Sequence, residues 1–288
     1  LVGCADLDLQ PTNMISEDAV KNDPKLVNAF LTKIYHNVNW EPNEQVGARD
    51  GNKVAWKHWR FVDFITGGEG TAMAPWQESI KASTDIPNAS GARTSLNYWP
   101  YGNIRSANEI IEILNEATFD PETVKIQIAE ARFMRAFMYL EMAKRYGGVP
   151  LELTPKQLDA SYDELYTPRS TLQATYEQIF ADLDAAIADL PGTAMSGKAT
   201  KWAAHALKSR AALYAARIAK YHPQSSDGLT SIPAGLAGGY YTMSHASASA
   251  IIDSGKYPLH TGGGTYQKTY SEVLTKKGNS EMLSLIHI

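Results

Sequence analysis

The sequence predicts a mainly α-helical fold, built from tetratricopeptide-like helical hairpins that carry long irregular loops. Apolar residues recur at helical spacing in several segments of about 15 to 22 residues. One of these segments, 200–221, carries many alanines, which allow neighbouring helices to approach closely. Two insertions, 151–169 and 225–239, break the period that a regular repeat protein would show.

The amino-terminal part of the chain combines one expected helix with an irregular stretch. Residues 24–38 place Leu26, Phe30 and Ile34 at helical spacing. Between residues 40 and 100 this periodicity fades, and glycine, proline, asparagine and aromatic residues dominate. We therefore expect an amino-terminal tether over 1–23, followed by one helical domain over 24–282.

From residue 101 onward the pattern becomes strongly helical. Two apolar stripes follow each other, and the second should end at Gly147-Gly148, where glycine can adopt a left-handed cap. Ser170 and Gln173 can form a capping box at the start of the next helix, which Pro191 ends. Two further helices are expected over 200–221 and 242–254. The stripes comprise Ile104, Ala107, Ile111 and Leu114, then Ile126, Ala129, Phe133, Ala136, Phe137 and Leu140.

Composition and motifs exclude several classes of protein. The 27 Lys and Arg residues against 31 Asp and Glu give a net charge of −4, which argues against a nucleic-acid partner. The single cysteine excludes an intrachain disulfide, and the scattered histidines show no ligand spacing, so we expect no metal and no cofactor. Carboxylate pairs such as Asp182 with Asp184 could suggest a glycoside hydrolase, but these two point to different sides of a helix, so no catalytic residue is assigned.

The only cysteine lies in a distinctive place. Residues 1–4 read Leu-Val-Gly-Cys, which resembles the lipobox of bacterial lipoproteins, where the cysteine sulfur carries the lipid. We therefore expect lipidation of Cys4, which would anchor the chain without a spanning helix.

The helical segments contain the motifs of a known family. Residues 129–140 read AEARFMRAFMYL and residues 145–150 read RYGGVP, which together resemble the signature of SusD/RagB lipoproteins. Further matches follow in order along nearly the whole chain: Trp99-Pro100-Tyr101 with Ile104-Arg105, Pro168-Arg169-Ser170-Thr171, and Ser254-Gly255-Lys256-Tyr257.

The resemblance implies a binding protein and not an enzyme. A member of this family would be lipid-anchored on the surface of the outer membrane. It would capture an oligosaccharide or polysaccharide and deliver it to a SusC-like TonB-dependent transporter. Two alternatives remain open, a relative that binds peptides and a helical-repeat scaffold that binds only proteins.

The aromatic residues before the helical scaffold are the candidate binding site. Five of the six tryptophans lie in this stretch, and a sugar ring can pack its apolar face on an indole. The expected ring contacts are Trp76, Tyr98 and Trp99, although Trp99 also fits a structural role at a helix start. The expected polar contacts are Arg60, Asp63, Arg93 and Asn97.

The carboxyl-terminal residues are expected to be foreign to the protein. Residues 283–288 read Leu-Ser-Leu-Ile-His-Ile, which resembles the translation of a transposon end used in sequencing libraries. Because members of the family are usually longer, we also expect a missing carboxyl-terminal portion.

Overall fold

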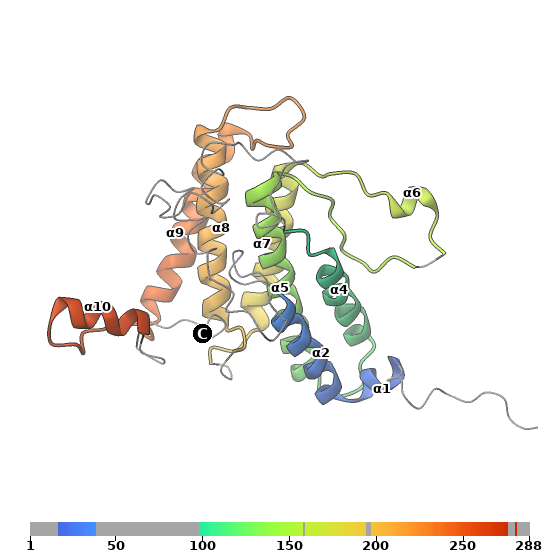
Figure 1. Ribbon diagram of the computed structural model, residues 1–288, viewed down its shortest axis with the longest axis horizontal. Helices are drawn as coiled ribbons and strands as arrows, with labels where there is room; N and C mark the ends of the chain where they lie inside the picture. Colours follow the sequence, from blue (N-terminus) through green and yellow to red (C-terminus); the bar gives the residue numbers. More distant parts are fainter. Residues whose placement is uncertain (1–16, 39–97, 158, 194–196, 276–279, 281–288) are drawn as a thin grey trace, which may run out of the picture.

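The computed structural model describes residues 17–38, 98–157, 159–193, 197–275 and 280. Within them the chain forms helices and no strand, which confirms the predicted mainly α-helical class (Figure 1). The described helices are α1 (Glu17–Asn22), α2 (Pro24–Asn37), α4 (Tyr101–Asn115), α5 (Pro121–Tyr146), α6 (Tyr162–Leu165), α7 (Leu172–Asp189), α8 (Lys201–Tyr221), the 3-10 turn η2 (Ala234–Leu236), α9 (Ala237–Asp253) and α10 (Tyr266–Thr275).

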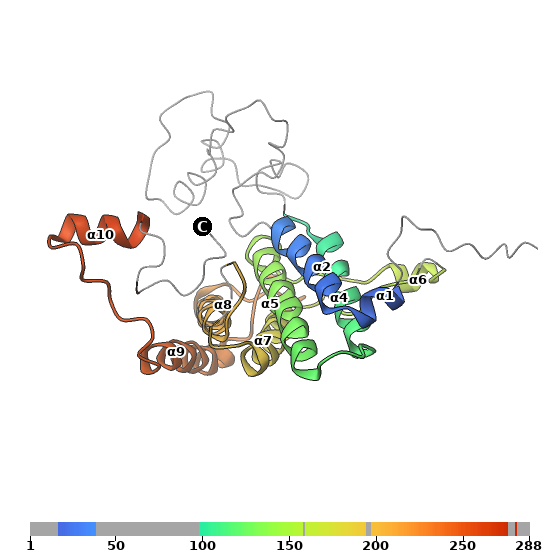
Figure 2. The ribbon, with the colours of Figure 1, turned by 90° about the horizontal axis from the view of Figure 1, so that it is seen from below.

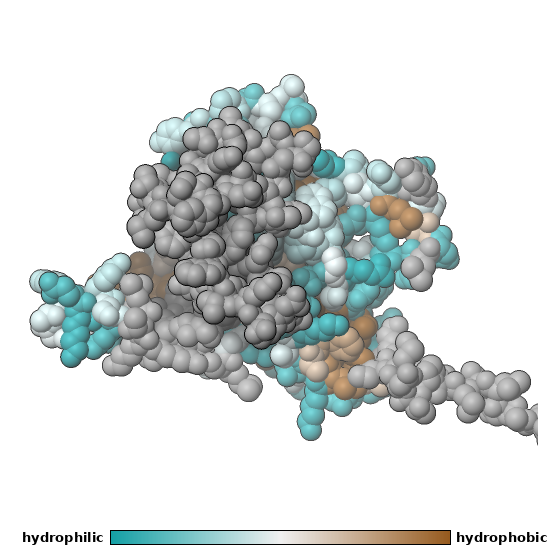
Figure 3. All heavy atoms as spheres, viewed as in Figure 1, coloured by the Kyte–Doolittle hydropathy of each residue, from teal (hydrophilic) through white to brown (hydrophobic). Residues whose placement is uncertain are grey.

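The long helices pack as antiparallel neighbours. Along the chain, α4, α5, α7, α8 and α9 run alternately down and up in Figure 1, and each packs against the next. Seen from below, they form one curved layer, with α10 and the connection that carries α6 projecting at opposite ends (Figure 2). The surface of the described part is mixed, with hydrophilic residues over α10 and separate apolar patches beside α6 and near the end of α4 (Figure 3).

Helix α5 is the centre of this layer. It contacts α2, α4, α7 and α8, so it needs apolar residues all round and not one narrow stripe. The side chains of Met134, Met138, Tyr139, Leu140 and Met142 are fully buried. The alanines of α8 allow close packing on α7 and α9, as the sequence predicts; those buried are Ala203, Ala204, Ala211, Ala212, Ala215, Ala216 and Ala219.

A buried ion pair joins α5 to α7. Arg135 donates from Nε and a terminal nitrogen to the two carboxylate oxygens of Asp182, at 2.8 and 2.6 Å. Its other terminal nitrogen donates to Asn108 of α4 at 2.7 Å and to the Leu153 carbonyl at 3.3 Å. Arg135 therefore fixes the connection that follows α5, and the same side chain also links three helices. Asp184 pairs instead with Lys208, so it does not share a site with Asp182.

Two predicted helix starts were wrong. Ser170 does not cap α7, because Thr171 is the cap and accepts from the Ala174 amide at 3.1 Å. Gln173 does not reach back, but donates forward to Glu177 at 2.7 Å. Helix α9 begins at Ala237 and not at residue 242, since its first turn contains glycines, whose low helix propensity hides it from the pattern.

Candidate functional site

Four aromatic residues meet where α4 begins and α5 ends. Pro100 caps α4 and its carbonyl accepts from the amides of the first turn, which places Trp99 immediately before the helix. Tyr101 lies in the first turn of α4, and Tyr146 is the last residue of α5. We call Tyr98, Trp99, Tyr101 and Tyr146 the α4 entry cluster.

Trp99 is the exposed member of this cluster. Its side chain is 51% exposed although two rings support it. The indole centroid lies 5.0 Å from the Tyr101 ring at a tilt of 56°, and 5.1 Å from the Tyr146 ring at 80°. Both are favourable edge or tilted arrangements. The indole is thus held from within while part of it remains open to solvent.

Hydrogen bonds fix the rings beneath the indole. The Tyr101 hydroxyl donates to the Pro150 carbonyl at 2.7 Å, and the Tyr98 amide donates to the Tyr146 hydroxyl at 2.8 Å. Arg169 closes the turn after α5, because it donates to the carbonyls of Tyr146 at 2.5 Å and Gly148 at 2.7 Å. The cluster is therefore a fixed support for Trp99 and not a flexible loop.

Tyr98 lies beneath the surface. Its side chain is buried, so the two predicted ring contacts that the structure describes, Tyr98 and Trp99, differ in exposure. The Arg145 guanidinium lies 5.4 Å from the ring centroid, and Arg145 pairs with Glu141 at 2.8 Å. Burial raises the pKa of Tyr98 well above its usual value, with the Glu141 carboxylate adding to the effect. The Tyr98 hydroxyl therefore stays neutral.

The structure describes two of the predicted ligand-binding residues, Tyr98 and Trp99. The other predicted ligand-binding residues lie outside the described residues and stay predictions; they are Arg60, Asp63, Trp76, Arg93 and Asn97. Lipidation of Cys4 also lies outside the described residues and stays a prediction. Sequence reasoning did not assign Tyr146 or Arg169 to the site. Both belong to motifs quoted above, but they lie far along the chain from Trp99, and spacing alone does not bring such positions together.

The α4 entry cluster presents one open ring above neutral phenols. It offers an open indole face. Burial raises the pKa of Tyr101 as it does that of Tyr98, so both phenols remain protonated. Among the described residues, no group of three or more His, Cys, Asp or Glu could hold a metal ion.

Comparison with known proteins relates the chain to one family. A family model named SusD-like and described as "Starch-binding associating with outer membrane" matches residues 7–213. A search of the curated proteins gave no match.

Solved structures share the fold. A SusD-like protein from Bacteroides fragilis matches with a TM-score of 0.66 and 24% identity, over 96% of this chain and 47% of that one. A structure described as a laminarin-binding SusD-like protein matches at 0.53 and 22%, over 68% and 41%. Another, described with xylogluco-oligosaccharide, matches at 0.55 and 20%, over 79% and 40%. The chain thus spans about half the length of these structures or less, and identities this low show the fold alone.

Proposed function

The chain belongs to the SusD-like family, and on this basis we propose that it is a surface-exposed outer-membrane lipoprotein that captures glycans for uptake. In this proposal it binds an oligosaccharide without cleaving it and delivers it to a TonB-dependent transporter. Support comes from the family description, which names starch binding and the outer membrane, and from the relatives described with laminarin and xylogluco-oligosaccharide. The family resemblance found in the sequence is confirmed by the same match.

The observation that carries glycan binding is the half-exposed indole of Trp99 on its fixed support. A pyranose has an apolar face of C–H groups that can pack on an aromatic ring, while its hydroxyls need polar partners. Because Tyr101 and Tyr146 already hold the indole, little side-chain freedom would be lost on binding. A fixed, open ring is therefore well suited to a sugar ring.

Membrane attachment is proposed to depend on the lipid at Cys4. Among the helices of the described residues, none is long and apolar enough to cross a bilayer. A lipid contributes about 0.8 kcal/mol for each buried CH2, so several acyl chains would anchor the domain. Cys4→Ser should move the protein from the membrane fraction to the soluble fraction and abolish palmitate labelling. Unchanged fractionation and labelling would contradict the lipid assignment.

Glycan binding is tested with a tryptophan variant and a matched control. Laminarin and xyloglucan oligosaccharides are titrated into the purified chain by calorimetry. We expect Trp99→Ala to weaken the binding of at least one of them about tenfold or more, which corresponds to about 1.4 kcal/mol. Tyr266→Ala is the control, because Tyr266 is an aromatic residue of α10 that is 97% exposed and far from the cluster.

Three outcomes would oppose the proposal. Equal affinities for the wild type and Trp99→Ala would remove Trp99 from the site. Binding of peptides with no sugar signal would favour the peptide-binding alternative. Release of reducing ends by the pure protein would show an enzyme.

Delivery is tested separately, by co-purification of a TonB-dependent transporter from detergent-solubilised outer membranes.

A further inference from the structure

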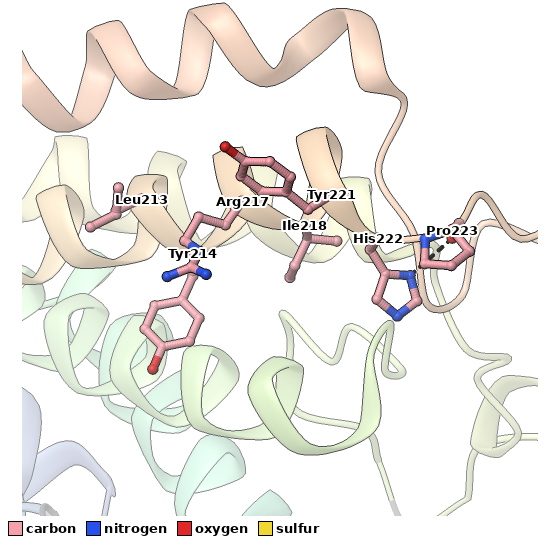
Figure 4. A pocket seen from close by; sticks show the side chains of 7 residues that line it. All are labelled: Leu213, Tyr214, Arg217, Ile218, Tyr221, His222 and Pro223. Carbon is pink, nitrogen blue, oxygen red and sulfur yellow. Dashed lines mark hydrogen bonds between the residues drawn. The ribbon is translucent and has the colours of Figure 1, made fainter. Parts of the chain in front are cut away.

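A second surface with ligand-binding chemistry lies on α8 and shares no residue with the α4 entry cluster. The last turns of this helix line a pocket of about 490 Å³, within the range of small-molecule sites. Its described lining residues are Leu213, Tyr214, Arg217, Ile218, Tyr221, His222 and Pro223 (Figure 4).

The lining side chains follow one face of the helix. Positions 213, 214, 217, 218 and 221 recur at the spacing of a single helical face. In Figure 4 the Tyr214 and Tyr221 rings extend away from each other, with Arg217 between them. These tyrosines are seven residues apart, a rise of about 10.5 Å along the axis. They remain 44% and 66% exposed, so two separated rings are open to a ligand.

Arg217 supplies a positive charge to the described lining of this pocket. Arg217 is exposed, and the described residues provide it with no ion pair. Lys220 lies 5.1 Å from the Tyr221 ring centroid and 5.9 Å from that of Tyr241 on α9. Lys144 lies 5.6 Å from the Tyr214 ring centroid, but its charge is paired with Glu141 at 2.7 Å. No Asp or Glu is among the described lining residues. Although the whole chain has a net charge of −4, this surface is cationic.

Aromatic rings beside the unpaired Arg217 suit a ligand that has both apolar faces and negative charge. Tyrosine faces can pack against sugar rings, and a guanidinium binds a carboxylate with two parallel hydrogen bonds. A neutral glycan would leave Arg217 without a partner, whereas a uronic acid unit would supply its carboxylate. An arginine in a protein keeps its charge at any relevant pH.

We propose that the α8 pocket binds acidic oligosaccharides, with Tyr214 and Tyr221 packing on sugar rings and Arg217 pairing with a uronate carboxylate. This inference rests on the proposed glycan-binding function and names a second subsite and a substrate class for it. The pocket shares no residue with the α4 entry cluster, so the two sites can be tested independently.

The test uses the full chain and oligogalacturonate as the acidic probe, with laminarin oligosaccharide as the neutral one. Arg217→Gln should weaken oligogalacturonate binding about tenfold or more and leave laminarin binding unchanged. Trp99→Ala should leave oligogalacturonate bound at the α8 pocket. The control is Lys33→Gln, which removes the same charge from an exposed position on α2. Because Arg217 is exposed, its variant should keep the wild-type circular dichroism and melting temperature.

Two outcomes would overturn the inference. One is that the wild-type chain binds no oligogalacturonate. The other is that Arg217→Gln and Lys33→Gln weaken the binding equally, which would show only a general charge effect. Either result leaves the proposed function intact if laminarin or xyloglucan oligosaccharide still binds through Trp99. Loss of all glycan binding by the wild type would instead remove the proposed function itself.

Discussion

One buried arginine fixes how three helices of this layer pack. Arg135 lies at the junction of α4, α5 and α7, and its guanidinium satisfies Asp182, Asn108 and the Leu153 carbonyl together. Its side chain is 7% exposed and that of Asp182 is 3% exposed. A buried pair of this kind contributes little net stability when complete, but becomes very costly when one partner is removed. The arrangement therefore favours one packing of the three helices over alternatives.

Removing the charge of Asp182 should lower the stability of the fold. Asp182→Asn leaves the Arg135 guanidinium buried without its counter-charge, so we expect the free energy of unfolding to fall by about 3 to 5 kcal/mol. Urea denaturation followed by circular dichroism measures it. Glu122→Gln is the control, since Glu122 lies 3.7 Å from Lys125 on the exposed side of α5 and should cost less than about 0.5 kcal/mol. A small effect of Asp182→Asn would contradict the structural role.

The Tyr98 hydroxyl, unlike the Arg135 guanidinium, is a buried polar group whose removal should not destabilise the chain. It is buried, and the described residues give it no hydrogen-bond partner. A buried polar group without a partner costs about 1 to 3 kcal/mol, so Tyr98→Phe should be neutral or stabilise the chain. Tyr101→Phe loses a 2.7 Å hydrogen bond to Pro150 and should destabilise it by about 1 kcal/mol. Thermal melts that rank the two variants in the reverse order would refute this account. Weaker glycan binding by Tyr98→Phe would support the ligand contact predicted for Tyr98.

At the scale of elements, the turn after α5 positions the site. Gly147 ends α5 with a φ of 77°, and the Gly148 amide donates to the Leu229 carbonyl at 2.6 Å. Positive φ is the region that only glycine occupies without strain. This turn leads directly into Pro150, whose carbonyl accepts a hydrogen bond from the Tyr101 hydroxyl. It therefore connects the end of α5 to Tyr101, one of the two rings that support Trp99.

A methyl group at Gly147 should disturb this turn. An added Cβ would lie 2.3 Å from the Leu229 carbonyl oxygen, in addition to the backbone strain. We expect Gly147→Ala to lower the free energy of unfolding by more than about 1 kcal/mol and to weaken glycan binding. Gly235→Ala is the matched control, because a Cβ there meets no atom within 4 Å. Equal melting temperatures for the two variants would show that the turn tolerates a side chain.

The sequence also predicted elements well where one local signal decides them. Three such features could be identified from residue types, because each has a direct physical cause. They are the start of α2 at Pro24, the end of α5 at Gly147 and the close packing at the alanines of α8. The first turn of α9 was missed because it contains glycines, whose helix propensity is low, while the packing of α9 on α8 is not visible in a local pattern. The pairing of Arg135 with Asp182 was also missed, because these residues lie on different helices and no periodicity relates them.

At the scale of the whole molecule, the helical hairpins form a rigid frame with two separate candidate surfaces. The α4 entry cluster lies where α4 begins and α5 ends, and the α8 pocket lies near the end of α8. The sequence predicted that tryptophan and tyrosine rings form the binding site, but packing determines which of these rings are exposed to solvent. Trp99 is half exposed while Tyr98, its neighbour in sequence, is buried. Exposure of a ring is set by long-range contacts, which the sequence pattern does not contain.

The most direct test of the central claim follows the Trp99 indole itself. The chain is labelled with 5-fluorotryptophan, and the fluorine resonance of Trp99 is identified by its absence from Trp99→Phe. Titration with laminarin or xyloglucan oligosaccharide should shift this resonance in proportion to saturation, while that of the buried Trp202 stays in place. If the glycan binds and the Trp99 resonance does not move, Trp99 is not the platform for the sugar.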